Sequence, residues 1–232
     1  MKDTGILMKT PMVQAILNDT KTETRRTREL GEINANPNDW HGEIDITADG
    51  DVKAKFINRV SGELKPVKSH LNLYDSLYIK ETFGYRDELS KKSLVIYKAS
   101  EDDQNRKWQS SLFMPKKYAR IWMEIESIGL ERLKKITQEE AISEGIHKIE
   151  TDSGYAYKDY EEEHGICFHP VNSFASLWNS INGANSFDIN PWVWVIKYKV
   201  ISKTGAEALK EYGSDNVYPQ RILNLRKEVN NG

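Results

Sequence analysis

Apolar and polar residues alternate in several short stretches of the chain, and this period of two predicts β-strands. Within residues 119–129, every second position from Ile121 to Ile125 is apolar. β-branched and aromatic residues, which favour strands, recur in short apolar runs. These runs lie at residues 5–8, 76–79, 94–97 and 191–201. Since the strands are short and helices are few, we expect an α+β fold built around a mixed, mostly antiparallel β-barrel with flanking short helices.

Helical spacing and capping residues predict three short helices. Thr10-Pro11 is typical of a helix start, and the apolar residues at positions 12, 13, 16 and 17 then share one face. Thr137 to Glu140 resembles a capping box, and the helix that it opens should end at Gly145. Residues 174–181 repeat the helical spacing, and residues 205–212 and 219–228 could be helical as well.

Polar stretches interrupt this pattern and suggest how the domain is organised. Residues 30–70 are rich in Asn, Asp and Gly and predict an inserted loop or hairpin. Residues 147–170 predict a charged loop, and the chain from residue 202 to 232 is a polar extension. We therefore expect one domain over residues 1–201 with inserts near 30–70 and 147–170.

Composition limits the classes of function. The 232 residues are 38% hydrophobic and 29% charged, which is ordinary for a globular protein. The formal net charge is -2, so any contact with nucleic acid must come from a local basic patch. Cys167 is the single cysteine, which excludes a disulfide within one chain and favours a reducing compartment. No apolar run approaches the roughly 18 residues of a membrane span, so we expect a cytoplasmic protein with no membrane contact.

Metal and cofactor signals are weak. His164, Cys167 and His169 lie close together, which is a pattern that soft metals can use. Structural zinc usually needs four ligands in two separated pairs, and the sequence offers no second pair. No phosphate-binding loop, dinucleotide fingerprint or nucleophile elbow is present. We therefore expect no metal and no cofactor.

Residues Asp19 to Arg26, Asp-Thr-Lys-Thr-Glu-Thr-Arg-Arg, resemble the signature of the ASCH family: a small residue, then Lys, a polar position and Arg. Further segments resemble phage-type ASCH proteins in the same order along the chain. They are residues 74–83, 111–121 and 174–183, the last running into 190–195. The resemblance implies a PUA-like barrel with a cleft for a nucleobase or RNA, so the expected partner is RNA, a nucleoside or a nucleotide. If the protein is phage encoded, it would act in the cytoplasm of a bacterial host cell.

Some ASCH proteins are amidohydrolases that remove the acetyl group from N4-acetylcytidine with a lysine, a threonine and a glutamate. Matching the segments places these roles at Lys21, Thr24 and Glu124. A threonine hydroxyl needs a base, a lysine of lowered pKa can supply one, and a glutamate can protonate the leaving amine. On a regular strand, positions 21 and 24 point to opposite faces, so their side chains converge only in a loop or helical turn.

Simpler interpretations of the same residues stay open. Residues 21–28 could be a solvated basic run, and Glu124 could lie beside Glu126 on the solvent face of its strand. The chain is much longer than the hydrolase subgroup, mainly through its inserts and tail. A non-catalytic RNA- or nucleobase-binding module and a phage accessory or assembly protein are therefore the alternatives to an enzyme.

Six residues are candidates for ligand binding, namely Arg25, Arg26, Lys80, Glu81, Arg120 and Trp192. Strand parity points Glu81 inward, and its buried carboxylate then needs a partner such as Arg120 or a signature arginine. That pair could be structural or could belong to a ligand cleft. Trp192 shares a strand face with Trp194, where the rings either stack on bases or form core.

Overall fold

The structure is a computed structural model that describes residues 2–86, 95–101, 103–152 and 154–205. The protein is a mixed α+β protein, with most of its regular structure in strands and only short helices. The chain divides into two compact units. The first unit comprises the described residues of 1–13, 74–124 and 199 onward, and the second comprises those of 14–73 and 125–198. The predicted α+β class is confirmed.

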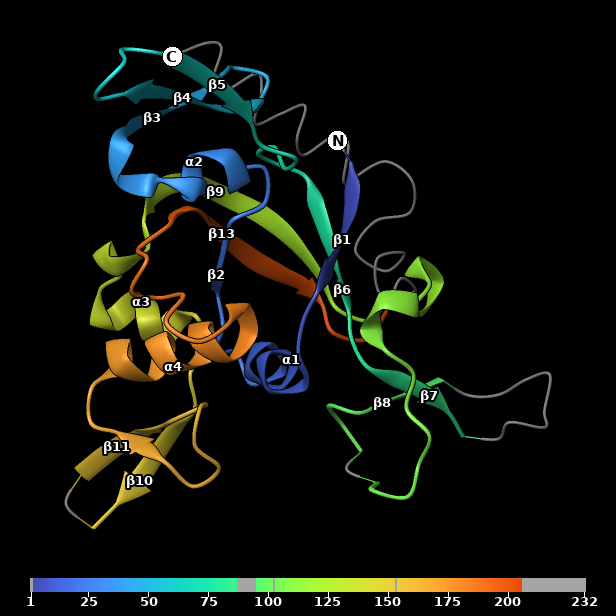
Figure 1. The fold of residues 1–232 in the computed structure, drawn as a ribbon. Helices are drawn as coiled ribbons and strands as arrows, with labels where there is room; N and C mark the ends of the chain where they lie inside the picture. Colours follow the sequence, from blue (N-terminus) through green and yellow to red (C-terminus); the bar gives the residue numbers. More distant parts are fainter. Residues whose placement is uncertain (1, 87–94, 102, 153, 206–232) are drawn as a thin grey trace. The chain divides into compact units, whose positions relative to one another are not determined.

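The first unit is built on three strands that lie side by side (Figure 1). β1 (Asp3–Leu7) pairs in parallel with β6 (Ser76–Lys80), and β6 pairs antiparallel with the start of β9 (Trp122–Arg132). β7 (Phe83–Tyr85) and β8 (Val95–Tyr97) form an antiparallel hairpin. Two 3-10 turns, η2 (Ser111–Phe113) and η3 (Lys116–Tyr118), precede β9. Apolar side chains of β6, β7 and β9 are buried as its core.

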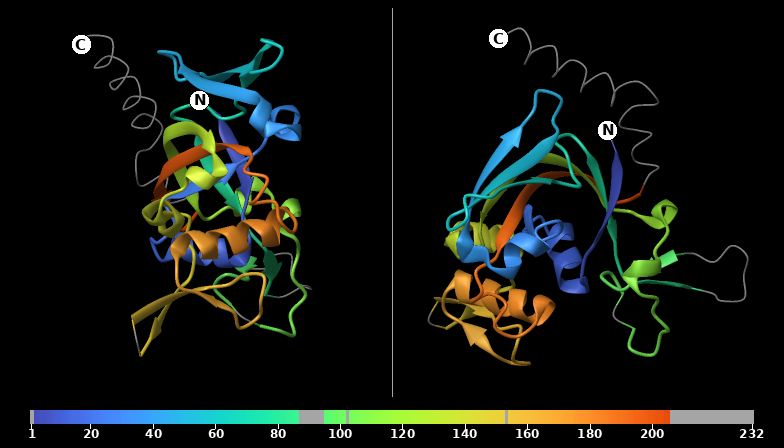
Figure 2. Two further views of the ribbon diagram at one scale, coloured as in Figure 1. Left: turned by 60° about the vertical axis from the view of Figure 1, so that its left-hand side comes forward. Right: turned by 45° about the horizontal axis from the view of Figure 1, so that its top comes forward.

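The second unit contains β2 (Glu23–Arg26), which pairs antiparallel with β13 (Trp192–Ser202). After β2, α2 (Gly31–Ala35) and η1 (Pro37–Asp39) lead into a separate three-stranded antiparallel sheet (Figures 1 and 2). Its strands are β3 (Trp40–Ile46), β4 (Val52–Asn58) and β5 (Leu64–Lys68). The insert predicted at residues 30–70 is therefore an ordered sheet with two short helical turns.

Two helices of the second unit, α3 (Gln138–Ser143) and α4 (Pro170–Asn182), pack side by side (Figure 1). The 3-10 helix η4 (Leu133–Lys135) precedes α3. Between these two helices along the chain, a small antiparallel sheet is formed by β10 (Lys148–Thr151), β11 (Gly154–Lys158) and β12 (Ile166–Cys167). The prediction of a loop over residues 147–170 is therefore wrong. Cross-strand pairing outweighed the local polar composition, because the backbone N–H and C=O groups of polar residues can form the hydrogen bonds of a β-sheet as well as those of apolar residues.

Within the largest sheet the strand order is β1-β6-β9-β13-β2, so β1 and β2 are edge strands and the described residues form no closed barrel. The PUA-like barrel stays a prediction.

α1 (Thr10–Leu17) begins at Thr10 and not after it, since the carbonyl of Lys9 already accepts the N–H of Val13. α4 begins at Pro170, four residues before the predicted start, with proline in the first helical turn. Residue 94 of the predicted strand, and residues 206–212 and 219–228 of the predicted tail helices, lie outside the described residues. None of the described helices is long and apolar enough to cross a membrane.

Candidate functional site

The segment that resembles the ASCH signature is buried. Lys21, Glu23, Thr24 and Arg25 are each only 2% exposed, although three of the four are charged. β2 is held in extended form by β13, with Thr24 opposite Ile196 and Arg25 opposite Val195. The interpretation of residues 21–28 as a solvated run is therefore wrong for these four positions. Buried charges persist only with partners, and those partners define the candidate site.

Lys21 has an acceptor for each of its three ammonium hydrogens. Its Nζ donates to the carbonyl oxygens of Glu23, at 2.8 Å, and of Glu144, at 2.7 Å. The third acceptor is the carboxylate oxygen Oε2 of Glu144, at 2.7 Å. Burial lowers the pKa of Lys21, the Glu144 carboxylate opposes that shift, and the Arg26 charge adds to it. Lys21 is thus a buried amine that is easier to deprotonate than a surface lysine.

Arg25 is surrounded by four carboxylates. Its guanidinium lies 2.5 Å from Glu23, 2.9 Å from Glu131 and Glu140, and 3.3 Å from Glu144. Burial by itself lowers the pKa of Arg25, but these carboxylates outweigh it and raise the pKa overall. All three nitrogens are engaged inside the protein. This arrangement favours a structural role for Arg25 over contact with a phosphate.

Glu144 is brought to Lys21 by the way in which α3 begins and ends. The predicted capping box is confirmed: the Thr137 hydroxyl accepts the N–H of Glu140, and the Glu140 carboxylate accepts the N–H of Thr137. The helix ends at Ser143, Glu144 is its C-cap, and Gly145 follows with a φ of +83°. A Cβ on Gly145 would lie 2.7 Å from the Cβ atoms of Ala15 and Lys21. Glycine therefore permits the close approach that forms the Lys21–Glu144 bridge.

Sequence reasoning missed Glu144, although a signal was present. A carboxylate at the C-terminal end of a helix faces the negative end of the helix dipole, which is unfavourable unless a cation compensates. Glu144 occupies that position at the end of α3, where the last turn carries no basic residue. A misplaced charge of this kind indicates a tertiary partner, and here the partners are Lys21 and Arg25.

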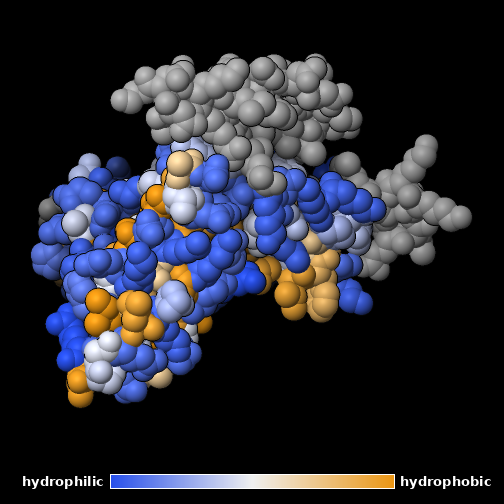
Figure 3. Space-filling model, turned by 90° about the horizontal axis from the view of Figure 1, so that it is seen from above, coloured by the Kyte–Doolittle hydropathy of each residue, from blue (hydrophilic) through white to orange (hydrophobic). Residues whose placement is uncertain are grey.

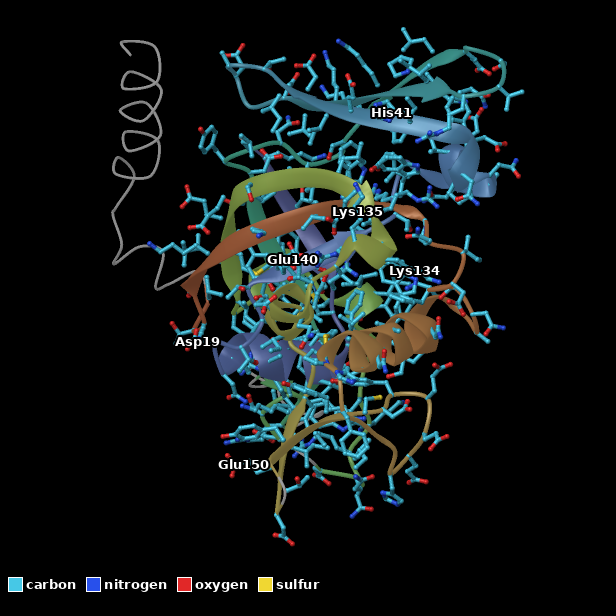
Figure 4. All side chains as sticks on the ribbon, turned by 90° about the vertical axis from the view of Figure 1, so that its left-hand side faces the viewer. Asp19, His41, Lys134, Lys135, Glu140 and Glu150 are labelled. Atoms are coloured by element: carbon cyan, nitrogen blue, oxygen red, sulfur yellow. The ribbon has the colours of Figure 1, made fainter. Side chains whose placement is uncertain are left out.

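Other titratable groups adjoin the Lys21–Glu144 pair. Burial raises the pKa of Glu23, which the hydrogen bond from Arg25 opposes. Burial also raises the pKa of Tyr198 well above its ordinary value, and the Glu144 charge adds to the shift. The Tyr198 hydroxyl donates to the carbonyl of Lys21 at 3.4 Å. Figure 4 shows Glu140 in the middle of this unit, between His41 on the β3–β5 sheet and Glu150 on the β10–β12 sheet.

Thr24 and Arg26 alternate with Glu23 and Arg25 along β2, so their side chains lie on the other face of the strand. Arg26 is opposite Trp194 in the register with β13, and burial lowers its pKa while Glu144 opposes the shift. Lys21 precedes β2, and its ammonium reaches the peptide that joins Glu23 to Thr24. The Lys21 amine and the Thr24 backbone are thus close, whereas the Thr24 side chain faces away from Glu23.

Glu124 lies in the first unit, whereas Lys21 and Thr24 lie in the second. On β9 it is opposite Ser76 of β6 and is half-buried, while Glu126 is exposed. Glu124 is therefore more enclosed than Glu126. The carboxylate that hydrogen bonds to Lys21 is that of Glu144.

Glu81 and Arg120 form a buried pair in the first unit. The Glu81 carboxylate accepts from Nε of Arg120 at 2.9 Å and from Nη2 at 2.8 Å, and Glu81 is 1% exposed. The predictions that Glu81 points inward and pairs with Arg120 are confirmed. The Arg120 guanidinium also donates to Ser100 and lies 4.1 Å from the centroid of the Tyr97 ring. These contacts favour the structural interpretation of the pair over a ligand cleft.

The remaining candidates have different surroundings. Trp192 is buried, its indole N–H donates to the carbonyl of Pro37 at 3.1 Å, and its ring meets Phe56 edge to face at 5.4 Å. Both Trp192 and Trp194 belong to the core, which favours the core interpretation of these rings over stacking on bases. Lys80 is half-exposed and donates to the carbonyl of Leu112 at 2.6 Å.

The cysteine and histidines of the 147–170 region do not gather as metal ligands. Cys167 lies 3.8 Å from the Asp159 carboxylate, and burial raises the pKa of its thiol. Within the described ranges, no three His, Cys, Asp or Glu side chains are grouped as a metal ion requires. No family model, curated protein or solved structure matches the chain.

Proposed function

We propose that this protein binds RNA, a nucleoside or a nucleotide and hydrolyses an acyl-amide on a modified cytidine, as the resemblance to ASCH amidohydrolases implies. Membership of the ASCH family and the PUA-like barrel belong to the same proposal. The observation that carries it is the buried ion pair between Lys21 and Glu144, with 2.7 Å between Nζ and Oε2. A lysine of the signature segment is thus joined to a carboxylate with which it can exchange a proton.

The proposed chemistry begins with deprotonation of Lys21. Burial lowers the pKa of this amine, and Glu144 is the acceptor through which its proton can leave. Neutral Lys21 then takes the proton of the Thr24 hydroxyl while Oγ1 attacks the acyl carbon. The C–N bond breaks, the cytidine amine leaves with a proton from Lys21, and an ester remains on Thr24. Water activated by a carboxylate hydrolyses the ester and releases acetate.

Two carboxylates compete for the acid and base role in this scheme. The matched segments point to Glu124, and the contact with Lys21 favours Glu144. We assign the role to Glu144, because its carboxylate lies 2.7 Å from the Lys21 ammonium, which is within reach for proton transfer. Glu124→Gln and Glu144→Gln separate the two assignments, and Glu126→Gln is the matched control on the exposed part of β9.

The test is release of acetate from N4-acetylcytidine by the purified full chain, with and without a chelator. Turnover should persist with the chelator, since the proposed set contains its own nucleophile, base and acid. Thr24→Val and Lys21→Met should abolish turnover, and circular dichroism should verify that both variants are folded. The rate should rise with pH through the lowered pKa of Lys21, because only the neutral amine accepts a proton. Turnover in folded Thr24→Val would contradict the threonine nucleophile.

A second candidate function is a non-catalytic module that recognises RNA or a nucleobase. The observation that favours it is burial, since Lys21 and Thr24 are both 2% exposed and Lys21 already has three acceptors. Nucleotide affinity without any release of acetate from the folded wild-type chain would select this candidate. Isothermal titration calorimetry with N4-acetylcytidine and with cytidine measures that affinity independently of turnover.

A further inference from the structure

A short surface of the first unit combines exposed apolar side chains with lysines. Residues 105–120 carry five cations and no Asp or Glu, in a chain of formal net charge -2; the cations are Arg106, Lys107, Lys116, Lys117 and Arg120. Within this stretch Leu112 is 57% exposed and Phe113 is 71% exposed. We call Leu112, Phe113, Lys116, Lys117 and the adjacent Lys80 the Phe113 surface.

The exposure of Phe113 is imposed by a well-anchored turn. Met114 is 2% exposed, and its sulfur accepts the backbone N–H of Glu81 at 3.2 Å. Ser110 caps η2 by accepting the N–H of Leu112. With the residue after Phe113 buried and the start of η2 capped, the ring cannot turn inward without breaking these contacts. An aromatic ring that a rigid turn holds in solvent is typical of a contact surface.

Lysines of this surface are held by contacts within the first unit. The Lys80 ammonium donates to the carbonyl of Leu112 at 2.6 Å, which places a positive charge next to the residue that precedes Phe113. Lys117 is exposed, and its ammonium lies 4.9 Å from the centroid of the Tyr118 ring. Lys116 pairs with Asp3 at 2.5 Å, so that charge is partly neutralised. Lys80 and Lys117 are therefore the cations best placed to meet an anion.

Figure 3 shows hydrophobic residues in separate patches on an otherwise hydrophilic face of the protein. The Phe113 surface differs from a purely apolar patch because Lys116 and Lys117 follow Leu112 and Phe113 by three to five residues in the sequence. An exposed ring on a surface that also carries lysines suits a nucleic acid strand, in which each base adjoins a phosphate. A lipid surface fits less well, since interfacial binding grows with inserted apolar area and η2 offers only Leu112 and Phe113.

We propose that the Phe113 surface binds single-stranded RNA, with a base stacked on Phe113 and phosphates held by Lys80 and Lys117. The inference rests on the proposed function for the choice of RNA as the polyanion. It goes beyond that function because the surface lies in the first unit, whereas Lys21 and Glu144 lie in the second.

The experiment measures fluorescence anisotropy of a labelled single-stranded RNA of about 12 nucleotides with the full chain. Phe113→Ala should weaken binding about tenfold, as the loss of one stacked base does. The matched control is Phe168→Ala, whose ring is 73% exposed in the second unit and should not matter. Lys80→Ala with Lys117→Ala should lower the slope of log affinity against log salt by about 0.7 for each lost phosphate contact. Equal affinity of Phe113→Ala and Phe168→Ala would overturn the inference.

Two further measurements separate this inference from its rivals. Sedimentation with phosphatidylserine vesicles should show no binding that depends on Phe113, and a Phe113-dependent vesicle complex without RNA affinity would overturn the proposal in favour of a membrane surface. Release of acetate from the mononucleoside should be unchanged in Phe113→Ala. Phe113-dependent RNA binding without acetate release would support this surface and refute hydrolysis. Acetate release without any effect of Phe113→Ala on RNA affinity would support hydrolysis and refute RNA binding by this surface.

Discussion

Replacing Arg25 by Met removes the guanidinium around which four carboxylates gather. Two of these, Glu23 and Glu144, have side chains that are only 3% and 5% exposed. Glu144 would retain Lys21 at 2.7 Å, but Glu23 would retain only the ammonium of Lys197 at 3.6 Å. Glu131 and Glu140 are partly exposed to solvent, so the loss of Arg25 costs less free energy at these two carboxylates. The main cost is therefore the burial of an almost unpaired Glu23 carboxylate.

The size of the effect follows from that burial. Removing one partner of a buried ion pair costs about 3–5 kcal/mol, which is a large part of the 5–15 kcal/mol that stabilises a typical domain. At pH 7 we expect Arg25→Met to lower the free energy of unfolding by about 4 kcal/mol. With a urea m-value of about 2–3 kcal/mol/M, the midpoint should fall by about 1.5 M. Arg28→Met is the matched control, because Arg28 is 66% exposed and pairs only at the surface with Glu29.

The deficit in the free energy of unfolding of Arg25→Met, relative to the wild type, should depend on pH through Glu23. Burial raises the pKa of Glu23 in the folded protein, and loss of Arg25 removes two influences that lower it. The folded variant then holds this proton at pH values where the unfolded chain, with a pKa of about 4.3, has released it. Stability therefore falls as pH rises from about 4.3 through the raised folded pKa, by about 1.4 kcal/mol for each unit between the two pKa values. The deficit is smallest at low pH.

Urea unfolding followed by far-ultraviolet circular dichroism at pH 4 and pH 7 measures both effects. Arg28→Met should stay within about 0.5 kcal/mol of the wild type at both pH values. If Arg25→Met and Arg28→Met have the same midpoint, Arg25 is not an internal ion-pair partner in solution. If the deficit of Arg25→Met is the same at both pH values, the cost does not come from an ionised Glu23.

Two further predictions concern the helix that brings Glu144 to Lys21. Gly145→Ala should cost about 2–3 kcal/mol in urea unfolding, because its φ is +83° and its Cβ would meet Lys21 and Ala15, whereas Gly31→Ala, with open space around it, should be neutral. A neutral Gly145→Ala would refute the close approach. Thr137→Ala should cost about 1 kcal/mol by removing the cap of α3, and Thr137→Ser, which keeps the hydroxyl, should restore most of it. Equal losses in both Thr137 variants would show that the hydroxyl is not the cause.

Local patterns in the sequence determined those parts of the protein that depend on neighbouring residues. The alternation around Ile121 predicted β9, and the capping box at Thr137 predicted α3, which ends at Ser143, two residues before the expected end at Gly145. Strand parity alone pointed Glu81 inward, and its need for a partner pointed to Arg120 or a signature arginine; the structure shows that the partner is Arg120, 39 residues away. These predictions succeeded because backbone geometry fixes which side of a strand or which end of a helix a residue occupies.

Only the tertiary structure decided which charges are buried. The composition of residues 21–28 is that of a solvated run, and nothing local reveals that carboxylates more than 100 residues away compensate Lys21 and Arg25. A buried charge is stable only when partners from other elements replace its lost hydration, so its environment is set by chain segments that the local sequence does not contain. The resemblance to the ASCH hydrolases pointed to Glu124, and only the tertiary structure showed that the end of α3 brings Glu144 to Lys21.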